Sequence, residues 1–231
     1  MNVLAIDTSN QPMSVALLKD QQLAAELTVN VKRNHSIQLM PAIDYILNQA
    51  GLLPKDLNLI AVAEGPGSYT GLRIGMTTAK TLAWTLNLPI VAISSLEMLA
   101  ANLMYHNSYI CPFFDARRGN VYTGLYKATQ GKIEQVEDDF NTAMEEWLDE
   151  LKALNEPIWF ISSTDHSFDH IIKDKLGEHA ILIKHSLNFP KAGVLASLAL
   201  ECDPTPVHEL KPQYHRMVEA EAKWLEQNQK R

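Results

Sequence analysis

This chain has little cysteine, no long hydrophobic run and a deficit of basic residues. Its two cysteines, Cys111 and Cys202, are typical of a reducing compartment and provide no metal-ligand spacing. No apolar run approaches the roughly 18 residues of a membrane span. Since the first apolar run follows no basic stretch and meets Asp7 at once, we expect no signal peptide. We therefore expect a cytoplasmic protein with no membrane contact.

The charge balance limits the ligands that the chain can bind alone. It has 20 basic and 27 acidic residues, a net charge of −7. Affinity for nucleic acid comes largely from neutralising phosphates, so contact with nucleic acid would need a local patch or a basic partner. A hydrophobic content of 46% predicts an ample core, and 231 residues suffice for one large domain or two lobes of about 100 residues.

The order of apolar segments occurs twice along the chain. The first half predicts strands at 3–7, 14–18, 23–31, 58–63 and 90–93, with helices at 36–50, 70–87 and from an N-cap at Ser95 onward. The second half predicts strands at 109–114, 121–126, 132–136, 158–161 and 180–183, with helices at 142–154, 167–176 and 192–201. This α/β pattern predicts two tandem lobes, each a mixed sheet with helices on both faces. The lobes would span 1–105 and 106–203, before a tail at 204–231. The layout resembles the RNase H-like lobes of the actin, Hsp70 and sugar-kinase superfold, which hold nucleotide between them.

The segment from Gly65 to Gly75 has four glycines in eleven residues, between a predicted strand and a predicted helix. This order can aim a helix N-terminus at an anion such as phosphate, with Gly65 and Gly67 facing it. It is not a Walker loop, because Gly-Leu-Arg replaces Gly-Lys-Ser/Thr, and its spacing differs from the dinucleotide fingerprint. Tight packing of loop and helix is the alternative explanation of the glycines.

Two hairpins occupy matching places in the two halves. Asp7, Thr8 and Ser9 end the first strand, where the superfold has an acid and hydroxyls that face phosphate. Asp115 takes the same place in the second half, and Arg117 and Arg118 follow it. These side chains could face a nucleotide or another anion, because guanidinium pairs bidentately with phosphate and carboxylate. They could equally be turn residues and solvated loop charges.

The two long helices of the first half have almost no charge. The only charged residue at 36–50 is Asp44, and 70–87 contains only Arg73 and Lys80. A helix on the surface of a monomer normally has a charged face, so the pattern predicts burial against another protein, or alternatively inside a larger domain. Pro41 should kink the first helix or mark its first turn. The candidate interface residues are Leu39, Met40, Ile43, Ile46, Leu47, Ile74, Thr77, Lys80, Thr81 and Trp84.

Two further features are weaker. His166 and His170 have the i, i+4 spacing of zinc proteases, with Asp165 as a helix N-cap, but Ser167 stands where the general base would be. We therefore predict no metal site. The segment around Pro212–Arg216 and Glu219–Glu221 predicts a flexible or docking tail.

With these residues assembled, the chain resembles the bacterial TsaB (YeaZ) family, and its 65–75 and 115–122 segments are the specific ones. The similarity covers 4–9, 34–36, 39–41, 65–75, 94–97, 115–122 and 214–221. The resemblance implies a non-catalytic scaffold or activating subunit in the synthesis of threonylcarbamoyladenosine (t6A), a tRNA modification.

The resemblance also implies a set of partners. The catalytic TsaD-type paralogue binds metal through a His-x-x-x-His helix and transfers the threonylcarbamoyl group to the adenosine beside the anticodon. Ser95 and Leu99 stand at those two positions here, so the resemblance implies neither catalytic residues nor metal. It implies pairing through the two apolar helices, with the paralogue or as a homodimer, and further contacts with a TsaE-type ATPase and, through the complex, tRNA. Ser162–Asp165 replaces a glycine turn under adenosine, which implies at most weak ATP or ADP binding.

Two alternatives stay open from sequence. An ATP-dependent phosphotransferase of the sugar-kinase type would use Asp7 or Asp115 and would turn over ATP. A metallopeptidase would need stoichiometric zinc, for which only His166 and His170 offer useful spacing.

Overall fold

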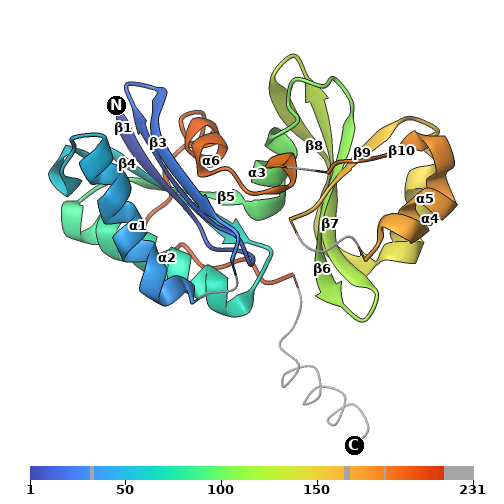
Figure 1. Ribbon diagram of the computed structural model, residues 1–231, viewed down its shortest axis with the longest axis horizontal. Coiled ribbons are helices and arrows are strands. Elements are labelled where there is room, and N and C mark those ends of the chain that lie inside the picture. The colour runs from blue at the N-terminus through green and yellow to red at the C-terminus, as the bar shows by residue number, and fades with distance from the viewer. Residues whose placement is uncertain (32–33, 164–166, 185, 216–231) are drawn as a thin grey trace, which may run out of the picture.

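The computed structural model describes residues 1–31, 34–163, 167–184 and 186–215, which form two lobes side by side (Figure 1). The first lobe contains a five-stranded sheet in the order β3-β2-β1-β4-β5. Its strands are β1 (Asn2–Asp7), β2 (Met13–Lys19), β3 (Gln22–Val29), β4 (Leu59–Gly65) and β5 (Ile90–Ser94). The first three strands are antiparallel, while β4 and β5 run parallel to β1, so the sheet is mixed.

The second lobe repeats this plan with the order β10-β9-β6-β7-β8. Its strands are β6 (Tyr109–Arg117), β7 (Asn120–Thr129), β8 (Lys132–Ala143), β9 (Ile158–Ile161) and β10 (Ala180–Leu182). Again an antiparallel meander precedes two parallel strands, which confirms the predicted mixed sheets. β8 continues to Ala143, beyond the predicted end at residue 136, because its pairing with β7 persists where its own residues are exposed or half-buried and lack an apolar pattern.

Helices cover the outer face of each sheet. The first sheet packs against α1 (His35–Gln49) and α2 (Tyr69–Leu86), and the second against α4 (Met144–Lys152) and α5 (Asp169–Leu176). Between the two sheets lie α3 (Ser95–Ala101) and α6 (Ala192–Ala199) (Figure 1). Short 3-10 helices occur at Pro54–Asp56, Gly177–His179 and Ser186–Asn188. Among the described helices, none is long and apolar enough to cross a bilayer.

The helix α6 packs on the first sheet, although the sequence places it within the segment 106–203. Its residues Ala192, Leu195, Ala196 and Ala199 belong to one buried cluster with Val3, Ala5 and Ala16. Small side chains make this contact close, because Ala5 pairs with Ala16 on one side and with Ala61 on the other. In exchange, α3 of the first segment packs against the second sheet through Leu96 and Leu99. A division at residue 105 therefore follows the strand order but not the packing of the helices.

The N-cap predicted for α3 is corrected, and one of the two roles predicted for Pro41 in α1 is excluded. The N-cap of α3 is Ser94, whose Oγ accepts hydrogen bonds from the amides of Leu96 (3.0 Å) and Glu97 (3.2 Å), while Ser95 is fully buried as the first helical residue. Pro41 does not mark the first turn of α1, which begins at His35 after an Asn34 cap and continues past the proline. The side-chain oxygen of Asn34 sets that start by accepting from the amide of Ser36.

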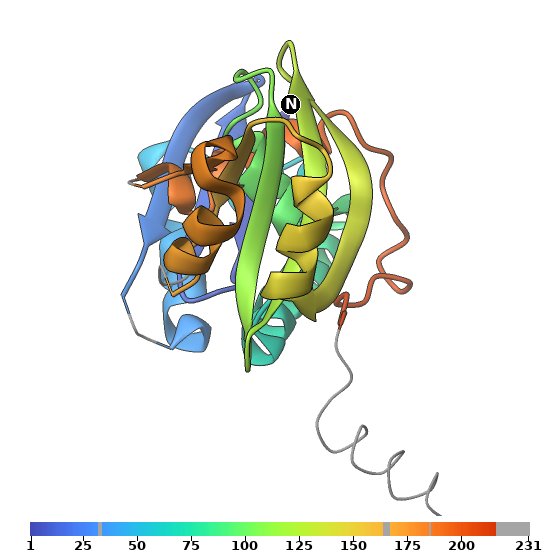
Figure 2. The same ribbon diagram turned by 90° about the vertical axis from the view of Figure 1, so that its right-hand side faces the viewer.

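The segment 204–215, here called the strap, is docked on the first lobe. The amide of Thr205 donates to the carbonyl of Ile90 on the edge strand β5 (2.9 Å), and the amide of Gln213 donates to the carbonyl of Glu64 (2.8 Å). Between them Leu210 is 6% exposed and joins the core of α1 and α2. Figure 2 shows the strap running down one side of the molecule. Of the predicted tail, this part is therefore ordered packing, while Arg216 and 219–221 lie outside the described residues.

Candidate functional site

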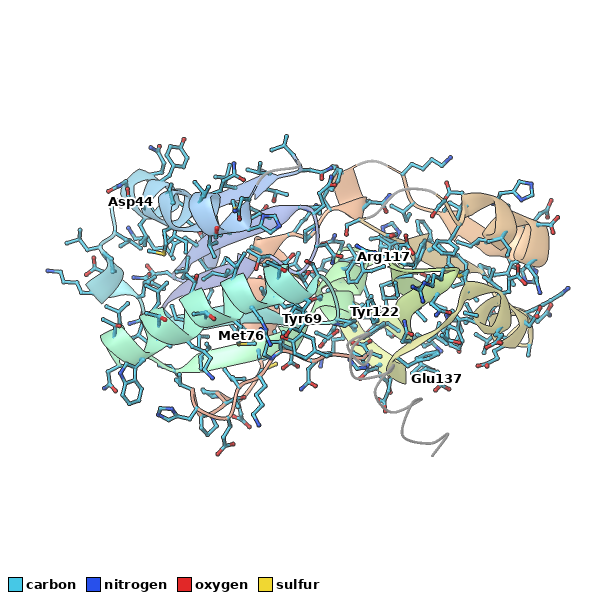
Figure 3. All side chains as sticks on the ribbon, turned by 90° about the horizontal axis from the view of Figure 1, so that it is seen from below. Asp44, Tyr69, Met76, Arg117, Tyr122 and Glu137 are labelled. Atoms are coloured by element: carbon cyan, nitrogen blue, oxygen red, sulfur yellow. The ribbon has the colours of Figure 1, made fainter. Side chains whose placement is uncertain are left out.

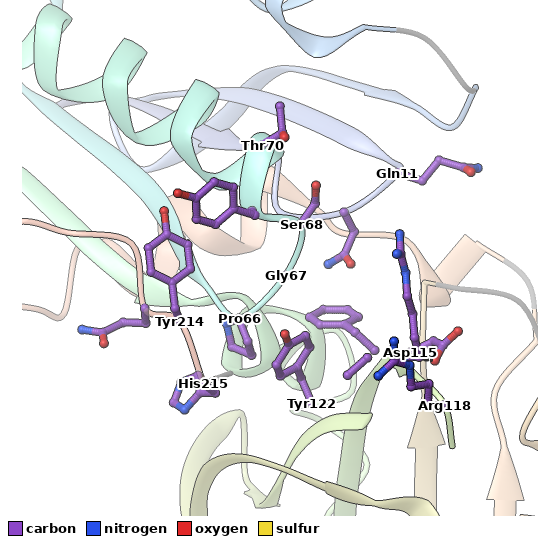
Figure 4. A pocket seen from close by; sticks show the side chains of 16 residues that line it. Gln11, Pro66, Gly67, Ser68, Thr70, Asp115, Arg118, Tyr122, Tyr214 and His215 are labelled. Atoms are coloured by element: carbon purple, nitrogen blue, oxygen red, sulfur yellow. Dashed lines mark hydrogen bonds between the residues drawn. The ribbon is translucent and has the colours of Figure 1, made fainter. Parts of the chain in front are cut away.

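A cleft of about 780 Å³ lies where the two lobes meet (Figure 4). Each lobe supplies one wall, and the strap supplies a third. The lining residues are Asn10, Gln11, Pro66, Gly67, Ser68, Tyr69, Thr70, Phe114, Asp115, Ala116, Arg117, Arg118, Tyr122, Gln213, Tyr214 and His215. The cleft thus brings together Gly67, Asp115, Arg117 and Arg118 of the predicted set, and their contact with an anion stays a prediction.

The glycine segment is packed tightly against the turn after β1. A Cβ on Gly67 would overlap the carbonyl oxygen of Ser9, and a Cβ on Gly71 would overlap the carbonyl oxygen of Thr8. The loop also uses its polar groups internally, since the amide of Ser68 donates to the carbonyl of Ser9 (2.6 Å). Ser68 Oγ in turn accepts from the amide of Gly71 as the N-cap of α2. The geometry therefore supports the packing explanation of these glycines.

Four predicted anion-facing residues lie beneath the cleft and cannot reach a ligand. Asp7, Thr8 and Ser9 are at most 1% exposed, and Gly65 is buried as well. Thr8 Oγ1 donates to the carbonyl of Gly71 (2.7 Å), which fixes the turn to the start of α2. This turn therefore forms the support under the cleft rather than its surface.

Asp7 is a buried carboxyl group with one satisfied oxygen. Its Oδ1 accepts from the amide of Ser9 (2.8 Å), while Oδ2 has no hydrogen-bond partner among the described residues. Burial raises the pKa of Asp7 to about 6, against the opposing effects of the Ser9 hydrogen bonds and of the nearby His35. With no exposed surface, this carboxyl cannot act on a substrate in the cleft.

The hairpin tip of the second lobe carries the cationic groups of the cleft. Arg117 and Arg118 have left-handed φ angles of 68° and 57°, and Gly119 follows with a φ of 79°. Asp115 Oδ1 accepts from the amide of Arg117 (2.7 Å), so this carboxylate stabilises the tip. Asp115 and both arginines are exposed, and Figure 4 shows Arg118 beside Asp115 at the cleft. Such an arrangement can pair with a phosphate or a carboxylate.

Sequence reasoning missed the aromatic side chains of the cleft. Tyr69 and Tyr214 stack with ring centroids 5.0 Å apart, and Tyr122 lies opposite on β7 (Figure 4). All three lie within segments that carry the family resemblance, which was the available signal. Nothing in their residue type distinguished them from core tyrosines such as Tyr126, which is 1% exposed.

A second polar cluster joins the lobes behind the cleft. Asp139 on β8 accepts from Ser94 Oγ of the first lobe and from the hydroxyl of Tyr126 (2.6 Å). Burial raises the pKa of Glu64, against a hydrogen bond from Gln213, and it also raises the pKa of Asp139. Burial, followed by repulsion from Asp139, raises the pKa of Glu97. Within the part of the chain that the structure describes, no three or more His, Cys, Asp or Glu side chains lie together so that they could hold a metal ion. The hydrogen bond from Ser94 to Asp139 makes this cluster a contact between the two lobes.

The outer surface of α1 and α2 is predicted to be a partner interface, and the structure changes which residues of α1 belong to it. Leu39, Ile43, Ile46 and Leu47 are at most 4% exposed and belong to the core beneath α1, so they cannot contact a partner. Met40, which is also predicted, is exposed, and the other exposed apolar residues of α1 are Ile37 and Tyr45. The predicted residues of α2 are more accessible than those of α1, since Thr77, Thr81 and Trp84 are exposed and Ile74 and Lys80 are half-buried.

We call this surface the helical face, defined by Ile37, Met40, Tyr45, Ile74, Thr77 and Trp84. Figure 3 views α1 and α2 from this side and labels Tyr69 near the start of α2. A groove of about 510 Å³ lies on it, lined by Ser36, Tyr69, Thr70, Arg73, Ile74, Thr77 and Thr78. Its charged residues along α1 and α2 are few, namely Asp44, Arg73 and Lys80.

Comparison with known proteins identifies the family. A family model described as tRNA N6-adenosine threonylcarbamoyltransferase (TsaD) matches residues 26–223. The tRNA threonylcarbamoyladenosine biosynthesis protein TsaB of Bacillus subtilis strain 168 is 46% identical over 98% of this chain and 99% of its own length. The chain belongs to the TsaB family. The TsaB of Escherichia coli K12 is 35% identical over 58% of each chain.

Solved structures agree with the TsaB fold. A Pseudomonas aeruginosa protein described as similar to peptidase YeaZ has a TM-score of 0.80 and 26% identity, covering 93% of this chain and 99% of its own. A hexokinase of Thermus thermophilus has a TM-score of 0.50 at 7% identity, covering 87% and 98% of the two chains, which shows a shared fold alone. These likenesses confirm the predicted actin-like and sugar-kinase-like class of fold.

Two predicted features fall partly outside the described residues. His166 and the N-cap candidate Asp165 lie there, so the histidine pair stays a prediction, although His170 lies within α5. The turn 162–165 is described only at Ser162 and Ser163.

Proposed function

We propose that this chain is a non-catalytic scaffold or activating subunit that pairs with a TsaD-type enzyme in the synthesis of threonylcarbamoyladenosine in tRNA. A relative that matches over nearly the full length is named for that pathway, and the model that matches 26–223 is that of the transferase itself. The partner would thus have the same fold as this chain. The helical face carries the proposal, because it leaves large apolar side chains exposed where a monomer would have charge.

The proposed lack of catalysis rests on the burial of the positions that a catalytic paralogue would use. Ser95 and Leu99 in α3 are both 0% exposed, and neither offers an imidazole ligand. The phosphotransferase alternative is not favoured, since Asp7 is buried and Asp115 stabilises its own hairpin tip. In this proposal the chemistry belongs to the partner.

Further contacts are proposed for the assembled complex. We propose that a TsaE-type ATPase and tRNA join the complex, and that the helical face also permits a homodimer in the absence of the enzyme. Exposed Arg117 and Arg118 are the described cations of the cleft that would contact an anion, including weakly bound ATP or ADP. Mixing the isolated chain with ATP distinguishes the scaffold role from the phosphotransferase alternative, because a phosphotransferase would turn ATP over and a scaffold would not.

Titration of the full chain with its TsaD-type enzyme tests the pairing. Trp84 is 66% exposed on α2, and Trp84→Glu should weaken binding at least about 100-fold by placing a charge in an apolar interface. Tyr105→Glu is the matched control, since Tyr105 is 76% exposed away from α1 and α2. Binding by Trp84→Glu at wild-type affinity, measured by calorimetry, would refute the proposed interface.

A further inference from the structure

The strap contacts one side of α2. Tyr69, Arg73, Lys80 and Trp84 follow one another at spacings of four, seven and four residues, so they form a stripe along a 3.6-residue helix. Lys80 Nζ donates to the carbonyl of Leu210 at the middle of this stripe (2.8 Å). Seen from below, α1, α2 and the strap lie across one side of the molecule (Figure 3). The helical face therefore continues onto a third element.

At the C-terminal end of α2, the strap meets Trp84 without covering it. The ring of His208 packs edge-on against the Trp84 indole, with centroids 4.8 Å apart and an interplanar angle of 69°. Trp84 nevertheless keeps 66% of its surface exposed. The pair thus presents two adjoining rings, one from the helix and one from the strap, to an approaching surface.

At the N-terminal end of α2, a second cluster is held in place by its own contacts. The Arg73 guanidinium lies 4.1 Å from the centroid of the Tyr69 ring, and Arg73 Nε donates to the hydroxyl of Tyr214 (3.1 Å). Tyr69 and Tyr214 stay 44% and 41% exposed. Because Tyr69 and Arg73 also line the groove between α1 and α2, this cluster forms the edge of the helical face.

We infer that the strap is part of the docking surface, and that the TsaD-type enzyme contacts the Trp84–His208 pair and the Tyr69–Arg73–Tyr214 cluster together. This inference rests on the proposed function. Trp, Tyr and Arg dominate the binding free energy of interfaces, and side chains already held in place lose little conformational entropy on binding. The strap thereby supplies one residue to each of two anchor points separated by the length of α2.

The occupant is the enzyme rather than a second copy, because the strap contacts lie at the border of the helical face. Because the enzyme has the same fold as this chain, α1 and α2 can pair with the corresponding helices of either the enzyme or a second copy. A transferase of Anaeromyxobacter strain Fw109-5, 30% identical over 55% of this chain, is aligned over only 44% of its own length. The same stretch is a smaller share of the enzyme than of this chain, so the enzyme is the longer of the two and has additional surface to reach past α2 to the strap.

The test measures affinity of the full chain for the enzyme by calorimetry in strap variants. His208→Ala and Tyr214→Ala should each weaken binding about tenfold, and the double variant about 100-fold, since each removes one anchor. Tyr214→Phe keeps the ring and should lose only part of that effect. Tyr105→Ala and His179→Ala are matched controls that should bind like the wild type. Unchanged melting temperatures show that the fold is intact, and the conservative His208→Asn replaces His208→Ala if the latter unfolds.

The outcomes separate the two levels of the proposal. Weak binding by Trp84→Glu with strap variants within twofold of the wild type would overturn the inference and leave the proposed function standing. Wild-type binding by Trp84→Glu would refute the pairing itself. A loss of self-association in the strap variants, seen by sedimentation with enzyme affinity unchanged, would assign the strap to a second copy and overturn the inference.

Discussion

The turns that follow β1 and β6 have the same local geometry in opposite surroundings. Asp7 accepts from the amide of Ser9 at 2.8 Å, and Asp115 accepts from the amide of Arg117 at 2.7 Å, so the same i to i+2 bond forms in both lobes. Yet Asp7 is fully buried with a raised pKa, while Asp115 is exposed at the cleft. A shared plan thus fixes the turn but not its environment.

The glycine segment causes this difference. In the first lobe, Gly67 and Gly71 let the start of α2 contact the turn directly and bury it. The hairpin of the second lobe has no such cover, and its tip residues Arg117 and Arg118 remain exposed. The outer helices also differ in charge between the lobes. In the second lobe α4 carries acids such as Glu145 and Glu146, whereas α1 and α2 of the first lobe are nearly uncharged. Each lobe therefore has one surface suited to contact and one suited to solvent, at different places.

The largest expected effect comes from filling the space that the glycines leave. Gly71→Ala should lower the free energy of unfolding by about 3 kcal/mol or more, because its Cβ would overlap the Thr8 carbonyl, which is backbone and cannot rotate away. Gly119→Ala in the second hairpin should cost only about 1 kcal/mol, since its Cβ meets open space and only the left-handed φ resists. Urea denaturation measures both, and equal costs would contradict the close packing.

The next effect concerns the two aspartates. The folded-state pKa of Asp7 is raised from 3.8 to about 6, so the folded chain binds the proton more tightly and the stability from this group falls as pH rises between about 4 and 6. Asp7→Asn cannot ionise. Its effect on the free energy of unfolding should therefore become more favourable by about 2 kcal/mol between pH 4 and pH 7, from the 1.4 kcal/mol per pKa unit.

Asp115→Asn provides the control for this titration. Asp115 is exposed, and its replacement should change stability by less than about 0.5 kcal/mol at both pH values. Denaturation curves of both variants and of the wild type at pH 4 and pH 7 measure these changes in stability. An Asp7→Asn effect that is the same at both values would show that the carboxyl is not isolated from water.

The smallest effect on stability should come from the outer helices. Thr81→Glu adds a charge to an exposed position of α2, and Glu146→Thr removes one from an exposed position of α4. Each should change the free energy of unfolding by less than about 0.5 kcal/mol. Only Thr81→Glu should weaken binding to the TsaD-type enzyme. A comparable loss with Glu146→Thr, measured by calorimetry, would move the interface to the second lobe.

Much of the fold follows from the sequence because both lobes alternate apolar strands and helices in the same order. The placement of α6 does not, since a helix of the sequence AGVLASLA is apolar on every side and does not indicate which sheet it covers. The same ambiguity affects α1, where Leu39 and Met40 are adjacent apolar residues, one in the core and one exposed. Periodicity identifies the helix, and tertiary packing decides which face is buried.

The site is predictable where residue chemistry alone is decisive. Arg117 and Arg118 line the cleft as expected, because charged residues at a hairpin tip remain exposed. The burial of this turn depends on the contact between Thr8 and Gly71, 63 positions apart, and turn residues are the same whether buried or exposed. The docking of the strap on the first lobe depends on a backbone hydrogen bond between Thr205 and Ile90, which no local sequence pattern indicates.

The position of α6 has a consequence for synthesis at the ribosome. The inner face of the first sheet, with Val3, Ala5 and Ala16, is covered by a helix that is made only after most of the chain has emerged. Until Ala199 leaves the exit tunnel, the earliest strands have one apolar face without its native cover, a state that favours aggregation or chaperone binding. The second lobe, whose sheet and outer helices lie within residues 109–182, can complete that packing earlier. The half of the molecule that is translated first is therefore the half that finishes folding last.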